Sequence, residues 1–427
     1  MSKKVIGTFE FDEGFIKTLK FMKGFVDRKN KNNSIVRVIA ENGNLLVSHC
    51  SMEAMARRTF QGVCTGTFDF NIGAESLIAL LNHFKVGKVD VSKSLIRVED
   101  ATGNEEQSRP LAVDGPVWDF PSFDGIEFNR LPENIFRVAA QSRYAVDDKK
   151  DEEESTFART KISISFEKGK GVVVASSGSR AMYAIGAIDY DGTSVEYLIS
   201  EWLVDSLSKL FAKNADMEIL GAETANKYLF KVDEIEIALA KPAESSFKPS
   251  IENAIERMKS LSSMSVEMRT QDVLHFIKGS MLEGGRADKV VMYLDAKSSV
   301  VRAEHAQNTY YNLLAAKFSG VLKDNMVIGF SPANMEVAYK SIKTPTTIQT
   351  FISDTSPSFI NVEWENYLIT HIILPLRLNE SVFEAISSSS KWDKLKTPEP
   401  INKPTETTPT TSPAPEFEAG ESPEILF

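Results

Sequence analysis

The strongest constraint on this chain is a repeat: one order of predicted helices and strands occurs three times in the 427 residues. Periodic apolar positions mark the helices, and β-branched runs mark the strands. The second helix of each copy starts near residues 74, 201 and 332, so the period is roughly 130 residues, the size of one domain. We therefore predict three copies of one α+β unit, each with two helices on one side of an antiparallel sheet.

The predicted helices and a change of composition near the end set the domain limits. Helices are expected at residues 12–23, 74–84, 132–145, 201–213, 270–281 and 332–342. In the last of these, Ser331 suits the N-cap and Pro332 the first helical position. The limits that follow are residues 1–127, 128–248 and 249–379 for the three domains and 380–427 for the tail. Pro, Thr, Glu and Ser dominate the tail from residue 397, so we expect a disordered segment.

Composition excludes several classes of protein. No apolar run is long enough to span a membrane, and the N-terminus leads into a predicted strand rather than a signal peptide, which predicts a cytoplasmic protein. The two cysteines, Cys50 and Cys64, are expected to be reduced thiols. The five histidines stand at no metal-ligand spacing, so no metal or other cofactor is expected. Residues 169–171 form a glycine-lysine turn that is far from a complete phosphate-binding loop, and no catalytic motif is found.

The charge of the chain is acidic overall, but its predicted helices carry cations. A net charge of −10 argues against nucleic-acid binding by the whole surface, although it allows one basic face. A single lysine is most often simply solvated, whereas cations on corresponding helices of three repeats suit sequence-independent contact with phosphates. Lys343 of the third repeat is a further cation of this kind. The cations predicted to contact DNA are Lys17, Lys20, Lys23, Arg28, Lys29, Lys31, Arg137, Arg143, Lys209, Lys213, Lys278 and Lys340.

The hydrophobic run at residues 371–378 closes the folded part of the chain. Pro375 cannot donate a hydrogen bond to a sheet, so it is expected at a strand end or a sheet edge. Leu374, Leu376 and Leu378 flank it, and we expect nothing later in the chain to cover them. Two interpretations remain open on these residues alone: a last core strand, or one wall of a hydrophobic groove that captures peptides of other proteins.

The three repeats, residues 174–181 (VASSGSRA) and residues 372–378 (IILPLRL) together resemble the bacterial DNA polymerase III β sliding clamp family. The resemblance covers about residues 4–379, and the hydrophobic-Pro-hydrophobic-Arg-Leu ending is its most specific part. In that family, two three-domain protomers join head to tail in a ring whose helices face the DNA. A groove between the middle and last domains accepts a short peptide from polymerases, the clamp loader and repair proteins.

The resemblance implies a homodimeric processivity factor that encircles double-stranded DNA, has no catalytic residues and tethers the replicative DNA polymerase and the clamp loader. The family's groove loop usually reads Thr-Asp-Gly-His-Arg-Leu; Gly178 and Arg180 match it, while Ala181 replaces the leucine and changes the shape of the pocket. The loop at residues 28–31 falls where the family has a basic loop. The groove residues implied are Ser176, Gly178, Ser179, Arg180, Ala181, Pro249, Ile372, Ile373, Leu374, Pro375, Leu376, Arg377 and Leu378.

Three questions remain open at this point. The substitutions indicate a divergent member, with a phage or mobile element as one hypothesis for its source. The alternative function is a clamp-like scaffold or regulator that binds replication proteins without encircling DNA. The chain ends in Ile425-Leu426-Phe427, which resembles the hydrophobic peptides that the family captures, and which is either a frayed terminus or a ligand of the groove.

Overall fold

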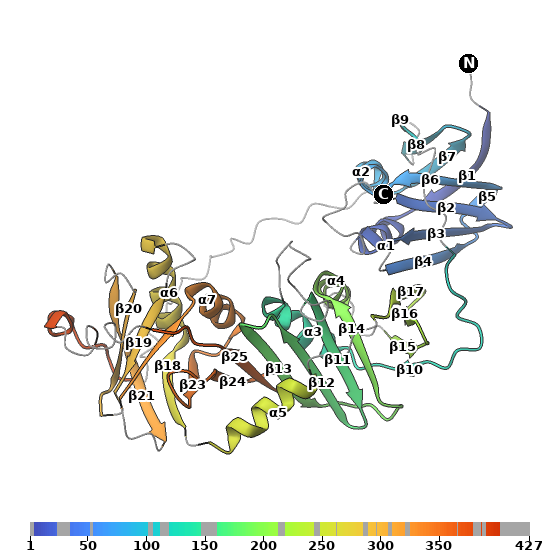
Figure 1. The fold of residues 1–427 in the computed structure, drawn as a ribbon. Coiled ribbons are helices and arrows are strands. Elements are labelled where there is room, and N and C mark those ends of the chain that lie inside the picture. The colour runs from blue at the N-terminus through green and yellow to red at the C-terminus, as the bar shows by residue number, and fades with distance from the viewer. Residues whose placement is uncertain are drawn as a thin grey trace, which may run out of the picture.

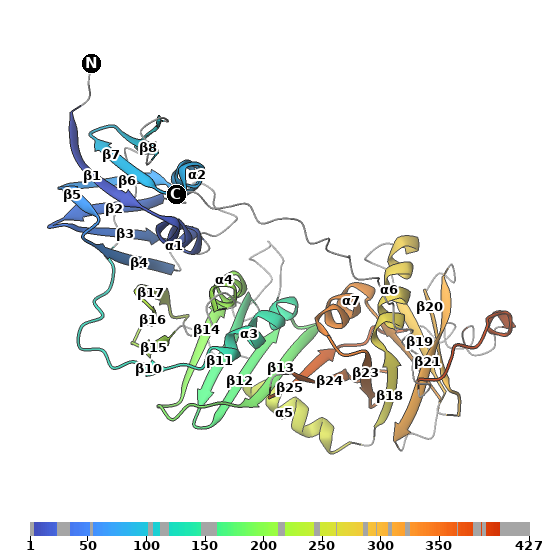
Figure 2. The ribbon, with the colours of Figure 1, turned by 180° about the vertical axis from the view of Figure 1, so that it is seen from behind.

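The structure is a computed structural model that describes residues 4–23, 35–51, 54–100, 106–111, 119–146, 160–211, 218–242, 248–261, 263–284, 289–295, 297–305, 310–320, 325–364, 366–378, 386 and 390–401. Three α+β units follow one another along an arc (Figure 1). Two helices of each unit lie on the concave side of the arc and the sheets lie outside them, as both views show (Figures 1 and 2). Within the described ranges, no helix is both long and apolar enough for a membrane span.

The first repeat folds as its periodicity predicts. Helix α1 starts after Asp12, whose carboxylate accepts the backbone N–H of Phe15 at 2.8 Å and so caps the helix. Helix α2 matches the predicted range. The elements are β1 (Val5–Phe11), α1 (Glu13–Lys23), β2 (Ile35–Glu41), β3 (Asn44–Cys50), β4 (Ala54–Gln61), β5 (Cys64–Gly66), β6 (Phe68–Gly73), α2 (Ala74–Phe84), β7 (Gly87–Ser92), β8 (Leu95–Asp100) and β9 (Glu106–Pro110).

The second repeat has the same order, with one predicted helix divided in two. The predicted helix at residues 132–145 is an α-helix, α3, followed by a 3₁₀ turn, η2. The elements are β10 (Asn129–Arg130), α3 (Asn134–Gln141), η2 (Ser142–Ala145), β11 (Lys161–Glu167), β12 (Lys170–Ser176), β13 (Arg180–Ala187), β14 (Val195–Ser200), α4 (Glu201–Phe211), β15 (Ile219–Glu223), β16 (Lys227–Val232) and β17 (Ile235–Ala240).

The third repeat confirms the predicted start of its last helix, since Pro332 begins α7 and the Ser331 side chain accepts the backbone N–H of Asn334. Helix α5 was not predicted, and the predicted domain limit at 248/249 falls inside it. The elements are α5 (Lys248–Lys259), β18 (Met264–Arg269), α6 (Thr270–Gly284), β19 (Val290–Leu294), β20 (Val300–His305), β21 (Tyr311–Gly320), β22 (Met326–Phe330), α7 (Pro332–Ser341), β23 (Thr346–Phe351), β24 (Ser358–Trp364), β25 (Tyr367–Ile373) and the 3₁₀ turn η4 (Ser390–Lys394).

The repeats join through shared antiparallel sheets. The strand orders are β5-β1-β7-β8-β9, β10-β15-β16-β17-β4-β3-β2-β6 and β14-β11-β12-β13-β25-β24-β23-β18-β21-β20-β19-β22. The first joint pairs β4 of the first repeat with β17, the last strand of the second repeat. The second joint pairs β13, the counterpart of β4, with β25, the last strand of the third repeat. The same two strands of the repeat therefore form both joints.

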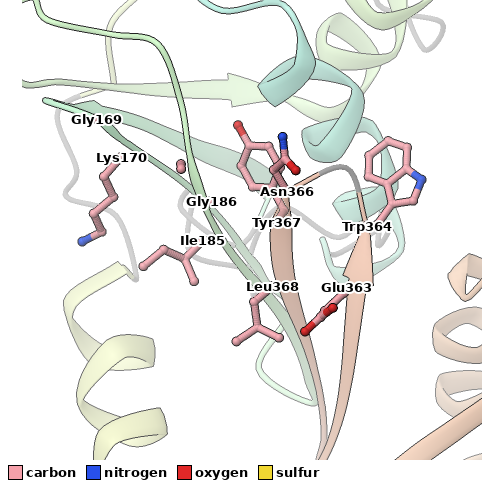
Figure 3. A pocket seen from close by; sticks show the side chains of 10 residues that line it. Gly169, Lys170, Ile185, Gly186, Glu363, Trp364, Asn366, Tyr367 and Leu368 are labelled. Carbon is pink, nitrogen blue, oxygen red and sulfur yellow. The ribbon is translucent and has the colours of Figure 1, made fainter.

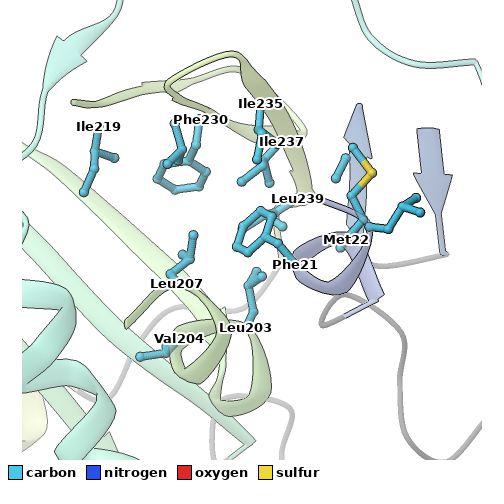
Figure 4. Packing of buried hydrophobic residues seen from close by; sticks show 14 of the residues in the cluster. Phe21, Met22, Leu203, Val204, Leu207, Ile219, Phe230, Ile235, Ile237 and Leu239 are labelled. Atoms are coloured by element: carbon cyan, nitrogen blue, oxygen red, sulfur yellow. The ribbon is translucent and has the colours of Figure 1, made fainter. Parts of the chain in front are cut away.

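One hydrophobic core crosses the first joint. Phe21 of α1 lies beside Leu203 of α4 and Ile237 of β17, and Met22 and Leu207 belong to the same cluster (Figure 4). All five side chains are at most 8% exposed. Burial of each such side chain contributes about 1.5–3 kcal/mol, so this core fixes the first two repeats to each other.

The eight-stranded and twelve-stranded sheets also carry apolar covers on their outer faces, where alternate strand residues point away from the helices. The segment at residues 119–128 packs Phe123 on Leu229 and Ala238. Helix α5 packs Ile255 on β12, β13 and β25. A third cover includes the buried Ile386 and Trp392 and packs on β19 and β22. The predicted tail thus contains a packed segment that its composition did not reveal.

Candidate functional site

The second joint brings the two segments of the predicted groove together. Strand β13 starts and β25 ends at the same edge, because Arg180 pairs with Ile373 and Ala181 with Ile372 in the antiparallel register. Just beyond the strands, the backbone N–H of Leu374 donates to the carbonyl of Ser179 at 3.1 Å. Residues far apart in the sequence thus form one continuous edge.

The loop before β13 is a tight turn that requires its glycine. Gly178 has a φ of +85°, in the left-handed region that side chains disfavour. The backbone N–H of Ser177 donates to the carbonyl of Arg180 at 3.0 Å, and the Gly178 N–H donates to the Ser176 hydroxyl at 3.3 Å. Gly178 and Ser179 are exposed at the tip of this turn, whereas Ser176 and Ala181 are buried in the strands.

Arg180 is a cross-link between the second and third repeats. Its guanidinium donates to the Asn334 side-chain oxygen of α7 at 3.0 Å and to the carbonyl of Val146 at 3.4 Å. The Asn334 amide in turn donates to the Ser179 hydroxyl at 3.4 Å. Sequence reasoning missed Asn334, since a lone asparagine in the first turn of a helix gives no signal of a distant partner.

The closing segment continues past the sheet. Strand β25 ends at Ile373, so Pro375 lies beyond a strand end as predicted. The Leu376 N–H donates to the carbonyl of Gly329 at 2.8 Å. A Cβ at Gly329 would come within 2.6 Å of the Leu378 side chain, which would have to shift to make room.

The apolar residues of this segment differ in how they are covered. Leu374 is 37% exposed, and Pro375 and Leu376 are half-buried, so all three are open to a ligand. Leu378 instead packs against the cluster that contains Trp392. The prediction that nothing later in the chain covers these leucines is therefore wrong for Leu378, because the tail folds back onto it. Arg377 is exposed, and its carbonyl accepts the Lys289 ammonium at 2.9 Å.

Helix α5 lies beside this edge on the outer face. Its Ile255 belongs to one buried cluster with Ala181 and Ile372. The predicted wall residue Pro249 is exposed in the first turn of the same helix. Spacing of Ile251, Ile255 and Met258 at helical intervals was the sequence signal that could have found α5.

A buried polar pair connects the second and third repeats behind the edge. The hydroxyl of Tyr144 in η2 and Nδ1 of His371 in β25 share a short hydrogen bond. Burial lowers the pKa of His371 to about 4, because a charged imidazolium loses its hydration there. Burial likewise raises the pKa of the Tyr144 hydroxyl, against a smaller opposite effect of Arg180. Both groups are therefore neutral near pH 7.

A separate cavity of about 740 Å³ opens at the other end of the same strand pair (Figure 3). Its lining includes Lys170, Ile185, Glu363, Tyr367 and Leu368. Because Gly186 pairs with Tyr367 at this end, the cavity and the predicted groove lie at opposite ends of β13 and β25. None of the predicted groove residues lines it.

The predicted cations fall into two groups where the structure describes their side chains. Lys17 and Lys20 on α1 and Lys278 on α6 are exposed, and within the described residues they form no ion pair. Four others are paired within the protein: Lys23 with Glu75 at 2.8 Å, Arg137 with Glu133 at 3.4 Å, Arg143 with Asp205 at 2.6 Å and Lys340 with Glu336 at 2.7 Å.

The other five predicted cations have side chains outside the described residues. Arg28, Lys29, Lys31 and Lys213 lie outside the described residues, as does the side chain of Lys209. The same holds for residues 402–427, which include the predicted ligand segment at 425–427. On the described helices, the best candidates for phosphate contact are Lys17, Lys20 and Lys278. No ion pair with a carboxylate of the described residues has to break before they bind a phosphate.

Comparison with known proteins gives no match among protein-family models and none among curated protein sequences. Solved structures do match. The DNA polymerase III β subunit of Thermotoga maritima has a TM-score of 0.73 at 15% identity, over 87% of this chain and all of that one. The sliding clamp of Bacillus subtilis has a TM-score of 0.72 at 14% identity, and that of Pseudomonas aeruginosa bound to griselimycin 0.70 at 13%, with the same coverage.

These likenesses define the class: a three-repeat clamp built from helices and shared antiparallel sheets. The chain has the fold of the DNA polymerase III β sliding clamps, at 13–15% identity to the three solved clamps. The predicted fold class is thereby confirmed.

Proposed function

We propose that this protein is a DNA sliding clamp, a processivity factor that encircles duplex DNA and tethers a replicative polymerase. Its work is binding alone, with no catalytic step. The observation that carries the proposal is the repeated joint. Two joints of one kind extend an arc of three repeats with helices on its concave side, and a third joint of that kind between chains would extend it further (Figure 1).

The repeat indicates which strands would form that third joint. Strand β21 is the counterpart of β4 and β13, and β9 is the counterpart of β17 and β25. Strand β9 ends its sheet, and within the described residues it pairs only with β8. Residues 311–315 of β21 pair on one side with β20. Open strand edges favour strand addition, so two chains would join head to tail as a homodimeric ring.

Contact with DNA would come from the exposed cations of the concave helices. Lys17, Lys20 and Lys278 would meet phosphates without reading bases, which suits a protein that slides. Acidic surroundings elsewhere on the chain, whose net charge is −10, would disfavour DNA outside the ring. The edge formed by Ser179 and Leu374 would bind a short hydrophobic peptide of a polymerase or clamp loader.

Retention on circular DNA tests this function. The protein is loaded onto nicked circular DNA, and the bound fraction is followed before and after the circle is linearised. A ring stays on the circle and is lost from the linear ends. Loss from both forms at the same rate contradicts encirclement.

A matched pair of variants tests the DNA-facing surface. K17A/K20A removes two cations from α1, whereas R257A/K259A removes two exposed cations from α5 on the convex side. The slope of log affinity against log salt should fall by up to about 4 in the first variant, because the two chains of the ring lose four cations and each lost phosphate contact contributes about 0.9. It should stay unchanged in the second. Equal slopes in both variants would remove the concave helices as the DNA contact.

The second candidate function is a scaffold that binds replication proteins without encircling DNA. The pairing of Lys23, Arg137, Arg143 and Lys340 with carboxylates favours it, because these ion pairs reduce the positive charge of the concave side. A chain that binds polymerase peptides and shows no retention on circles would be this scaffold.

A further inference from the structure

The two joints inside the chain share a second feature, an outer cover that contacts both sides of the joint. At the first joint, the cover with Phe123 belongs to a cluster with Met55 of β4 and with Leu229 of β16. At the second joint, α5 contacts Val174 on one side and Phe359 on the other. Each cover is made by the chain that follows the last strand of the preceding repeat.

The chain after the last repeat makes a third cover of this kind, which we call the strap: Ile386 and residues 390–396. The strap packs on the outer face of β19, β21 and β22. Strand β21 is the one that the first two joints predict as the next joining strand. In a single chain, the cluster of the strap contains residues of the third repeat and of the strap only.

The contacts of the strap are specific. The Trp392 indole N–H donates to the carbonyl of Ile386 at 3.0 Å, and its ring meets Tyr311 of β21 edge-on at 5.7 Å between centroids. The Lys391 ammonium lies 5.3 Å from the Tyr311 ring centre and forms an ion pair with Glu304, which is 2% exposed. A buried carboxylate needs such a partner, so the strap is held in one place beside the open edge of β21.

The side of the strap away from the sheet is charged. Asp393, Lys394 and Lys396 are exposed, which leaves a net charge of +1. On the first repeat, the outer face of β7, β8 and β9 corresponds to the face that the first cover contacts at Ala222, Leu229 and Ala238. That face carries charges in place of these apolar residues. They are Lys88, Asp90, Arg97, Glu99 and Glu106, linked by ion pairs and amounting to a net charge of −1.

We infer that the strap is a ring-closing latch: its exposed lysines bind the acidic outer face of β8 and β9 in a second copy of this chain. The inference rests on the proposed ring. The two internal covers are apolar and join repeats of one chain permanently, whereas charged contacts across the third joint are weaker and screened by salt. Such a latch suits a joint that has to open and close around DNA.

Charge reversal in the full chain tests the latch. The dissociation constant of the dimer is measured by sedimentation at low and high salt for the unmodified chain, for K394E/K396E and for the matched control R257E/K259E on α5. All four substituted residues are exposed, so the variants should fold. We expect K394E/K396E to raise the dissociation constant about ten-fold at low salt and to remove most of its salt dependence. The control should leave both unchanged.

A second variant, E99K/E106K, places lysines on the opposite face. It should weaken the dimer alone and restore it in combination with K394E/K396E. A dimer whose dissociation constant is the same in K394E/K396E as in the unmodified chain overturns the latch and leaves the ring intact. A full-length chain that stays monomeric at every concentration overturns the ring and the latch together.

Discussion

The two joints inside this chain obey one strand-pairing rule but differ in the side chains that cross them. At the first joint, one hydrophobic core contains residues of both repeats, among them Phe21 and Leu203. At the second joint, the last repeat keeps a core of its own, although Tyr367, Ile369 and the partly buried Trp364 pack into the large core. The apolar cluster of Ala181, Phe359 and Ile372 crosses this joint on its outer face. Polar contacts cross it as well, between Tyr144 and His371 and between Arg180 and Asn334.

Apolar and polar contacts place different requirements on the side chains at a joint. Apolar packing holds two repeats together without requiring particular groups at the edge. Polar contacts require defined positions, and they hold the turn at Gly178 against the closing segment at Leu374. The second joint therefore has an ordered edge, and this edge is the one that we propose for a partner peptide.

The largest expected effect is a loss of stability at the first joint. Phe21→Ala should lower the free energy of unfolding by roughly 3 kcal/mol or more, since it leaves a cavity in the core that the two repeats share. Phe84→Ala, at a half-buried phenylalanine in the same repeat, should cost less. Urea denaturation of both variants checks this. If Phe84→Ala is as costly as Phe21→Ala, the first joint is not held by this core.

The buried Tyr144–His371 pair at the second joint should make the stability of the protein depend on pH. The pKa of His371 is about 4 in the folded protein, below the ordinary value of 6.5. As the pH falls, His371 is therefore protonated in the unfolded chain before it is protonated in the folded protein. The stability that neutral His371 contributes is fully present above pH 6.5 and is lost as the pH falls toward 4. The loss due to His371 should be about 3 kcal/mol, and His371→Asn should remove it.

His49 is the matched control for this measurement. It is buried in β3 of the first repeat, and burial also lowers its pKa. His49→Asn should leave the part of the pH dependence that belongs to His371 in place. A His371→Asn variant with the full pH dependence of the unmodified chain would contradict the neutral Tyr144–His371 pair.

Single charges should matter more at the second joint than at the first. Arg180→Ala should lower the free energy of unfolding by about 1–3 kcal/mol, because it leaves the acceptor on Asn334 without its donor. Glu234→Gln removes the partner of Arg58 at the first joint, where the glutamate side chain is 69% exposed, and should cost about 0–1 kcal/mol. Thermal unfolding of the two variants measures the difference. Equal losses in the free energy of unfolding would contradict the predicted difference between the two joints.

The smallest expected effect concerns the tail. If residues 425–427 occupy the edge at Ser179 and Leu374, a chain that ends at Ile401 should bind a labelled clamp-binding peptide about two- to five-fold more tightly, because a tethered competitor is gone. The end point matters, since truncation at residue 379 would also remove the strap. Unchanged affinity would make the terminus a frayed end.

Much of the fold could be predicted because it depends on local patterns. The periodic apolar residues of α2 and the Ser331-Pro332 signal of α7 act within one helix, so their positions could be read directly. The three-fold order of elements then predicted the fold class. Pro375 was placed beyond a strand end for an equally local reason, its missing N–H.

The sequence by itself determined the repeat, the helix faces and the two segments of the candidate edge. Only the tertiary structure decided which cations are paired, that Asn334 binds Arg180, and that Trp392 returns to cover β21 beside Leu378. These contacts join residues that are distant along the chain. No local pattern encodes the partner of a lone Asn or Trp, because the strand pairing that brings it close is settled by packing of the whole chain.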